Sequence, residues 1–309
     1  MKKGIVYNLN PFNNETDMSS AEYIIKKLLA FILIYVISAV LGEGVIIGIL
    51  YGMGYDPLHG IMPAGEISEL LPYYGFLIFS LVTLLYCRFV EKKNIKSVGF
   101  SGNPADYLTG ISVAAILLFV ILGIGCLCGS ISFCGFNTNV SITGILLWAL
   151  AFGIQGAAEE IMCRGFLLNS LKNRIPIPLA ILISSTAFVF PHLSSLVEAD
   201  SVYVVVGIIN LYLVSIVFSM LVLWRSNIWI ACGLHSAWNF ILYVIMGLSL
   251  SGSESVSKGV VLFSVKDASI LNGAEYGIEA SVITTAVLGM LLFFMVKRWK
   301  GRICRNDIS

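Results

Sequence analysis

Apolar residues form about eight long stretches along the chain, and polar residues gather in the connections between them. The stretches lie near residues 28–53, 70–90, 107–130, 142–173, 177–197, 202–223, 228–249 and 280–296. A membrane-spanning helix needs roughly 20 apolar residues. Only helices and closed barrels can span lipid, and these stretches are too long and too uniformly apolar for barrel strands. The pattern therefore predicts an all-α, polytopic membrane protein with about eight transmembrane helices.

The composition agrees with a membrane protein and excludes some other classes. Hydrophobic residues make up 58% of the 309 residues and charged residues only 12%, whereas about 25% of a soluble domain is charged. The formal net charge of +1 provides no large basic surface, so we expect the lipid bilayer, and no nucleic acid, as a partner.

Basic and acidic residues alternate between successive connections. Lys and Arg precede the first stretch and follow the second, fourth, sixth and eighth. The connections after the first and fifth carry mainly acids, the one after the third carries no charge, and the one after the seventh mixes both signs. Short cytoplasmic loops are enriched in Lys and Arg. We therefore expect a multi-pass protein of a bacterial plasma membrane, with a cytoplasmic segment over residues 1–27, a transmembrane domain over 28–297 and a cytoplasmic tail over 298–309.

Polar and ionisable residues occur within three of the apolar stretches, where they are costly unless they pair, line a cavity or take part in chemistry. They are Glu159, Glu160 and Arg164 in the fourth stretch, His192 in the sequence FVFPH of the fifth, and His235 and Asn239 in the seventh. Phe188, one turn before His192, lies on the same face of its helix. These three stretches are therefore the candidates for a functional site.

Spacing indicates that these residues meet at one depth. The fourth and fifth stretches are joined by the polar turn Asn173 to Pro176, which predicts an antiparallel hairpin. Glu159 and His192 lie about equally far from this turn, roughly 25 Å along each helix. His235 lies roughly 12 Å into its own stretch. We expect one polar layer, roughly 10 Å below the cytoplasmic boundary on the same rise per residue.

Helical offsets assign partners within the layer. Glu160 and Arg164 are i,i+4 neighbours and are expected to form an ion pair, while Glu159 points about 100° away. Glu159 and His192 are placed to activate a water molecule as general bases. An Asn amide and a His N–H stabilise an oxyanion well, which predicts this role for His235 and Asn239. Phe188 is expected to form a wall of the site.

Two other interpretations of the same residues remain open. The Glu159 carboxylate could be satisfied by Gln155 alone. Glu159, His192 and His235 could instead hold a divalent metal such as zinc, although the HExxH sequence of many zinc peptidases is absent. We expect no cofactor, with that metal site as the alternative. A proton relay in a transporter, or a catalytically silent scaffold, would also use buried carboxylates and histidines.

Three motifs carry a resemblance to a known family. The sequence from Glu159 to Arg164 matches EExxxR, that from Phe188 to His192 matches FxxxH, and that from His235 to Asn239 matches HxxxN. In this order on membrane helices they resemble the CPBP family of CAAX proteases and bacteriocin-processing enzymes, also called the Abi family, over a core of about residues 142–248. The chain is similar in these motifs to type II CAAX prenyl proteases.

The resemblance implies a glutamate-type intramembrane endopeptidase with a polar cavity open to the cytoplasm. It implies that Glu159 and His192 activate water and that His235 and Asn239 form the oxyanion site. The implied substrate is a membrane-associated peptide or protein that can be lipidated. The family also includes immunity proteins and regulators without shown proteolysis, so a non-proteolytic regulator, immunity protein or transporter is the alternative.

Overall fold

The protein is a bundle of long helices in the computed structural model, which describes residues 4–196, 200–253 and 259–306, with side chains as far as residue 299. Within these residues, seven helices are long and apolar enough to cross a membrane. They are α2 (Ser20–Gly52), α3 (Glu66–Phe89), α4 (Asp106–Leu127), α5 (Ile142–Glu160) with its continuations, α7 (Ile177–Leu196), α8 (Ser201–Arg225) and α10 (Val282–Asn306). The predicted all-α, polytopic membrane fold is confirmed.

The remaining apolar stretch forms a shorter helix, α9 (Trp229–Phe240), which continues as the π-helical segment η4 (Ile241–Ile245). Residues 230–239 of α9 are all buried. Because protein surrounds this helix on every side, its length does not have to match the thickness of the hydrocarbon core. The eight predicted apolar segments are all helical, and this one lies in the centre of the bundle.

Shorter elements connect the long helices. They are α1 (Ile5–Leu9), the 3₁₀ turns η1 (Pro57–His59), η2 (Ile95–Val98), η5 (Ala274–Tyr276) and η6 (Ile278–Ala280), the π-helix η3 (Ile161–Leu168) and α6 (Asn169–Leu171). Two strands, β1 (Ile131–Phe136) and β2 (Val261–Val265), form a small antiparallel sheet. The sequence pattern did not predict this sheet, because each strand is short and its partner is far away along the chain.

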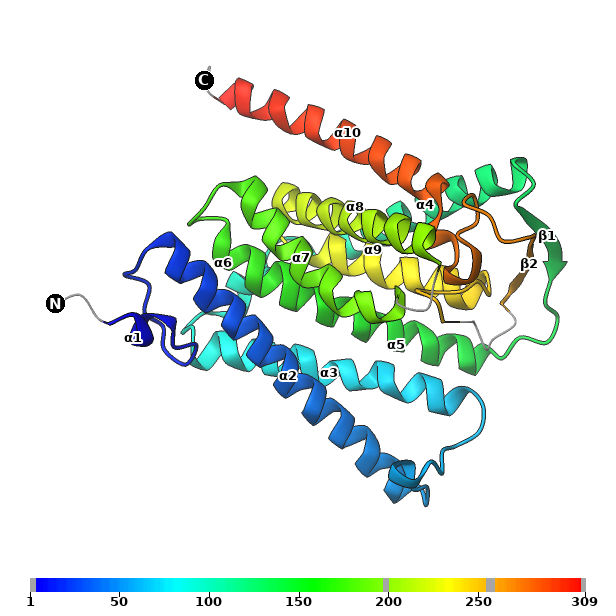
Figure 1. The fold of residues 1–309 in the computed structure, drawn as a ribbon, viewed down its shortest axis with the longest axis horizontal. Coiled ribbons are helices and arrows are strands. Elements are labelled where there is room, and N and C mark those ends of the chain that lie inside the picture. Colours follow the sequence, from blue (N-terminus) through cyan, green and yellow to red (C-terminus); the bar gives the residue numbers. More distant parts are fainter. Residues whose placement is uncertain (1–3, 197–199, 254–258, 307–309) are drawn as a thin grey trace.

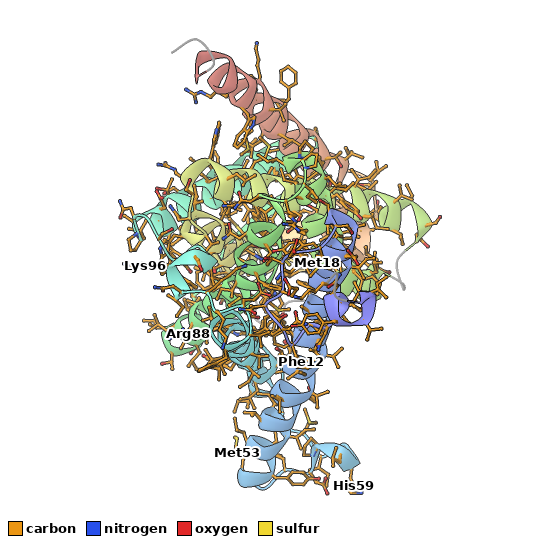
Figure 2. All side chains as sticks on the ribbon, turned by 90° about the vertical axis from the view of Figure 1, so that its left-hand side faces the viewer. Phe12, Met18, Met53, His59, Arg88 and Lys96 are labelled. Carbon is orange, nitrogen blue, oxygen red and sulfur yellow. The ribbon has the colours of Figure 1, made fainter. Side chains whose placement is uncertain are left out.

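The long helices run roughly parallel or antiparallel between two ends of the bundle. Figure 1 shows both chain termini at one end and the β1–β2 sheet at the other. Helices α2 and α3 lie along one side, and the connection between them projects from the bundle at the end away from the termini. Figure 2, which faces the end with the termini, shows Met53 and His59 at the tip of this projection.

Helix α2 begins at Ser20, earlier than the apolar stretch that starts near residue 28. The Ser19 side chain accepts a hydrogen bond from the Glu22 backbone, and the Glu22 side chain accepts one in return, which is a capping box. Lys27 therefore lies inside the helix, where it forms a buried ion pair with Glu91. Burial favours the neutral form of Glu91, but Lys27 and Lys93 outweigh it and lower the pKa of Glu91.

Glycines allow α9 to approach its neighbours closely. A Cβ built on Gly233 of α9 would lie 2.0 Å from the Tyr107 carbonyl oxygen of α4, and one on Gly110 would lie 2.1 Å from the Ile230 carbonyl oxygen. On the other side, a Cβ on Gly156 of α5 would lie 2.8 Å from the Ser236 backbone nitrogen. Small residues permit such close backbone contact between membrane helices. The position of α9, and of the polar residues on it, depends on these contacts.

Gly233→Ala is expected to lower the thermal unfolding temperature in detergent, because the added methyl group has no space and overpacking costs about 1–3 kcal/mol. Gly123→Ala is the matched control, since a Cβ on this α4 residue meets nothing within 4 Å. Equal unfolding temperatures for the two variants would show that α4 and α9 do not pack as closely as described.

Candidate active site

The polar residues of α5, α7 and α9 converge around the carboxylate of Glu159. One oxygen of this carboxylate, Oε2, lies 3.8 Å from Nε2 of His192 and 4.0 Å from Nε2 of His235. Both distances exceed the length of a direct hydrogen bond. The two imidazoles thus face one carboxylate oxygen across a small space, and the predicted common depth of these residues is observed.

The two adjacent glutamates have different surroundings. The side chain of Glu159 is 16% exposed, whereas those of Glu160 and Arg164 are completely buried. Residues i and i+1 of a helix point about 100° apart, so one carboxylate faces the cavity and the other faces the protein interior. Only Glu159 can meet a substrate or a water molecule in this arrangement.

The buried Glu160 carboxylate joins two site elements. Its Oε1 accepts a hydrogen bond from Arg164 at 2.7 Å, as the spacing predicted, and lies 3.1 Å from Nδ1 of His235. Arg164 also donates to the backbone and side-chain oxygens of Ser215 in α8. This network connects α5 and η3 to α8 and α9, and it fixes the orientation of the His235 ring.

His192 is oriented by its own helix. Its Nδ1 lies 2.8 Å from the backbone carbonyl oxygen of Phe188, one turn earlier in α7. A carbonyl can only accept, so Nδ1 carries the proton and Nε2 of the neutral ring is an acceptor facing Glu159. The Phe188 and His192 rings also pack together, with centroids 4.8 Å apart. Phe188 thus supports His192 through its backbone and its ring.

Gln155 connects Asn239 to Glu159. Asn239 donates a hydrogen bond of 2.9 Å to the Gln155 side-chain oxygen, and Gln155 donates one of 2.8 Å to Oε1 of Glu159. The contact between Gln155 and Glu159 considered from the sequence therefore exists, but Glu159 also faces two histidines. Asn239 has a second amide N–H available to a substrate, because each amide nitrogen carries two hydrogens.

Two of the three motif-bearing helices, α5 and α9, continue in π-helical form, and Arg164 lies within the first of these segments. Segment η3 (Ile161–Leu168) follows Glu160, and η4 (Ile241–Ile245) follows Asn239 closely. Such segments are rare and occur frequently at functional sites, because the wider turn changes the direction of the side chains. No pattern in the sequence predicted them, because their mostly apolar residues are also typical of an ordinary α-helix.

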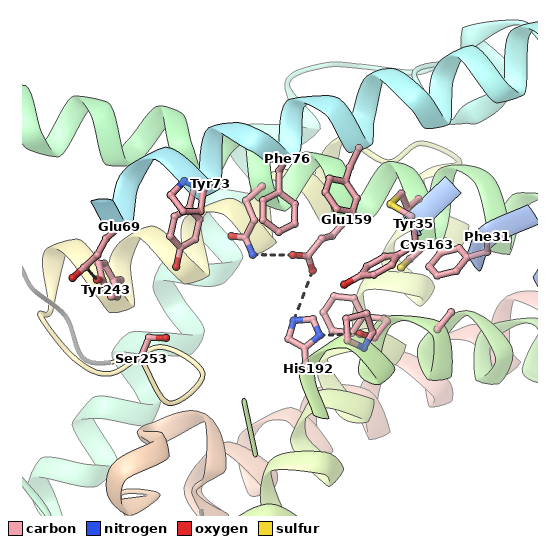
Figure 3. A pocket seen from close by; sticks show the side chains of 17 residues that line it. Phe31, Tyr35, Glu69, Tyr73, Phe76, Glu159, Cys163, His192, Tyr243 and Ser253 are labelled. Carbon is pink, nitrogen blue, oxygen red and sulfur yellow. Dashed lines mark hydrogen bonds and ion pairs between the residues drawn. The ribbon is translucent and has the colours of Figure 1, made fainter. Parts of the chain in front are cut away.

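Glu159 and His192 line a cavity of about 690 Å³ between α2, α3, α5 and α7. Phe31, Tyr35 and Cys163 lie on one side of Glu159 in Figure 3, and Glu69, Tyr243 and Ser253 lie on the other. His235 and Asn239 line an adjoining cavity of about 230 Å³, which shares Gln155, Phe188 and His192 with the first. The combined space brings the predicted bases and the predicted oxyanion donors together.

The cavity is lined by residues from both halves of the bundle. His192 lies one turn before Leu196, the end of α7 that is remote from the chain termini, and Glu69 lies near the start of α3 toward the same end. Phe31 of α2 and Cys163 of η3 lie nearer the end that carries the termini. The expected opening of the cavity to the cytoplasm stays a prediction.

Several lining residues could not be identified from the sequence. Tyr35 of α2, together with Glu69 and Tyr73 of α3, comes from helices that carry none of the three motifs.

Among the described residues, no group of three His, Cys, Asp or Glu side chains is arranged to hold a metal ion.

A comparison with protein families agrees with the site. Residues 141–241 match the family model described as Type II CAAX prenyl endopeptidase Rce1-like. This segment of the chain is similar to that family, and we call it the Rce1-like segment. It runs from the start of α5 into η4 and includes all seven predicted site residues. The match supports the resemblance to CAAX proteases and, broadly, an intramembrane endopeptidase, which is a hydrolase. No curated protein matches the chain.

Arg164→Met is expected to destabilise the Rce1-like segment strongly, because it leaves the Glu160 carboxylate buried without its cation, a change that costs about 3–5 kcal/mol. The double variant with Glu160→Gln should recover part of this loss. Arg88→Met, at an exposed position, is the control. Thermal unfolding in detergent measures all three, and equal unfolding temperatures for Arg164→Met and Arg88→Met would contradict the buried pair.

Proposed function

We propose that the protein is a glutamate-type intramembrane endopeptidase in which Glu159 and His192 activate a water molecule. The observation that carries this proposal is the convergence of the His192 and His235 Nε2 atoms on Oε2 of Glu159 beside a cavity. Helical spacing explains pairs within one helix, such as Glu160 and Arg164. It does not explain why residues of three different helices face one carboxylate oxygen. The Rce1-like match over the same helices supports the same activity.

The arrangement suits a bound water molecule. The Nε2 lone pair of neutral His192 and the Glu159 carboxylate are both acceptors, so they need hydrogens between them. A water that donates one hydrogen to each satisfies both groups and has its own lone pair directed away from them. This lone pair is the nucleophile, and the Glu159 carboxylate is placed to accept a proton from the attacking water.

Peptide hydrolysis then follows, and the proton that Glu159 takes from water passes on to the leaving amine. As the water oxygen bonds to the peptide carbonyl carbon, its proton passes to Glu159, and the carbonyl oxygen becomes an oxyanion. Asn239 donates a hydrogen bond to this oxyanion. The Nδ1 atom of His235 faces Glu160, so His235 donates to the oxyanion through Nε2 when that nitrogen carries a proton. The carbon–nitrogen bond breaks as the proton from Glu159 moves to the leaving amine. A free acid and a free amine result, and Glu159 is again a carboxylate.

The proposed substrate is a membrane-associated peptide or protein. The cavity combines the aromatic rings of Phe31, Phe76 and Phe79 with polar groups around Glu159. Such a lining can hold an apolar segment or a lipid chain beside a peptide bond that needs hydrogen-bonding groups. The family name refers to prenylated CAAX proteins, and a lipidated substrate is one that this lining can accommodate.

Glu159→Ala and His192→Ala are each expected to reduce cleavage of a membrane-tethered reporter peptide by a factor of roughly 100 to 10,000, the usual contribution of general acid–base catalysis. The assay uses the full chain in detergent, and mass spectrometry identifies the products. Glu43→Ala removes an exposed carboxylate of α2 and should retain activity. Full activity of a folded Glu159→Ala variant would overturn the assignment of Glu159 as the base. Absence of cleavage by the folded native chain would favour a regulator or transporter.

The proposed reaction uses no metal ion, so cleavage should survive a strong chelator of divalent cations. Purified protein should also contain less than one equivalent of zinc by elemental analysis. The decisive opposite result is loss of activity on chelation with recovery on adding zinc. That outcome would replace the water-activating pair by a metal site of Glu159, His192 and His235.

A further inference from the structure

Tyr73 of α3 lies where the two cavities of the site meet. The first cavity is lined by Glu159, the proposed base, and the second by His235 and Asn239, the proposed oxyanion donors. Tyr73 lines both cavities. In the proposed reaction the scissile peptide bond has to reach the base and the oxyanion donors at once. It therefore lies at the junction of the cavities, beside Tyr73.

Aromatic packing holds the ring of Tyr73 in place. Its centroid lies 5.4 Å from that of Trp148 and 5.0 Å from that of Phe152, with an edge contact in both cases. Trp148 and Phe152 belong to α5, stack on each other and are buried. Close-packed neighbours leave a ring little freedom to turn. Figure 3 shows Tyr73 between Glu69 and Glu159, with its hydroxyl group directed into the cavity.

The hydroxyl group of Tyr73 forms no hydrogen bond within the part of the chain that the structure describes. Three other tyrosines line one of the two cavities. Tyr243 and Tyr276 already form hydrogen bonds with neighbouring side chains, and Tyr35 lines the first cavity but not the second. Of these four tyrosines, Tyr73 alone brings a donor without a protein partner to the junction of both cavities.

A bound peptide brings further carbonyl groups into the cavity besides the scissile one. Carbonyl oxygens that leave water need a donor, because an unpaired buried carbonyl is costly. The Glu159 carboxylate and Nε2 of neutral His192 are acceptors and cannot serve them, and the oxyanion occupies His235 and Asn239. A neutral phenol is a donor. The Tyr73 hydroxyl therefore matches a carbonyl of a neighbouring peptide unit.

We propose that Tyr73 binds the substrate by donating a hydrogen bond to a backbone carbonyl next to the scissile bond. This role rests on the proposed peptidase function and adds to it a substrate-binding residue from a helix that carries none of the three motifs. The group recognised is the peptide backbone, which every polypeptide presents. The contact thus positions the chain across Glu159 without selecting particular side chains.

Tyr73→Phe removes the hydroxyl group and keeps the ring. We expect kcat/KM for the membrane-tethered reporter to fall roughly 5- to 100-fold, the effect of leaving one buried carbonyl without its donor. The unfolding temperature should stay that of the native chain, because no hydrogen bond within the protein is lost. Tyr74→Phe is the matched control, since the hydroxyl of this neighbour donates to the Leu147 carbonyl oxygen and lines neither cavity. Equal kcat/KM for both variants would overturn the role of Tyr73.

Direct contact is tested with reporter peptides in which one peptide unit at a time, on either side of the scissile bond, is replaced by an alkene that lacks the carbonyl. At the position that Tyr73 contacts, the replacement should lower kcat/KM of the native chain at least fivefold and that of Tyr73→Phe less than twofold. Such non-additivity is the sign of a direct interaction. Equal losses in both proteins at every position would mean that Tyr73 touches none of these carbonyls, which contradicts the proposal.

Substrate binding is measured separately in the Glu159→Ala background, where the reporter stays intact. Adding Tyr73→Phe should raise the Kd of the reporter by the same factor by which it lowers kcat/KM, because the contact is made before and during the reaction. Cleavage by the native chain, with kcat/KM and Kd unchanged by Tyr73→Phe, would overturn the role of Tyr73 and leave the peptidase function standing. A folded native chain that cleaves no reporter would overturn both.

Discussion

The ion pair between Glu160 and Arg164 is the interaction on which the rest of the site depends. Charges inside a membrane bundle require partners, because lipid and apolar side chains cannot solvate them. Arg164 forms an ion pair with Glu160 and donates a hydrogen bond to Ser215, and Glu160 also contacts His235. The same constraint that satisfies two buried charges therefore fixes the relation of α5, α8 and α9. His235 and Asn239 take their places in the site as a consequence.

Adjacent positions on one helix divide structural support from chemistry. Glu160 is fully buried in the ion-pair network, while Glu159, one residue earlier, faces the cavity and both histidines. The Glu160 carboxylate is bound by the Arg164 guanidinium and has no exposed surface, so it cannot meet a substrate. Glu159 receives only an uncharged donor, Gln155, at its other oxygen. Glu160 thus stabilises the helix packing, and the neighbouring Glu159 is the reactive group.

The fold also determines where a reactive group can be reached. Close glycine contacts hold α9 against α4 and α5, and this leaves the open space on the side of α2 and α3. This space is lined by Phe31 and Tyr35 of α2 and by Glu69 and Tyr73 of α3. Which groups surround Glu159 therefore follows from how these helices pack, because neither α2 nor α3 carries one of the three motifs.

The sequence by itself determined the membrane fold, the eight apolar segments and the Glu160–Arg164 pair, because these depend on local hydropathy and on helical spacing. It also brought Glu159 and His192 to one level through the turn between their helices. Only the tertiary structure decided the link from His235 to Glu160, the bridge through Gln155, and the cavity wall on α2 and α3. These features depend on which helices become neighbours and on where π-helical turns shift side chains, and neither is encoded in the periodicity of a single segment.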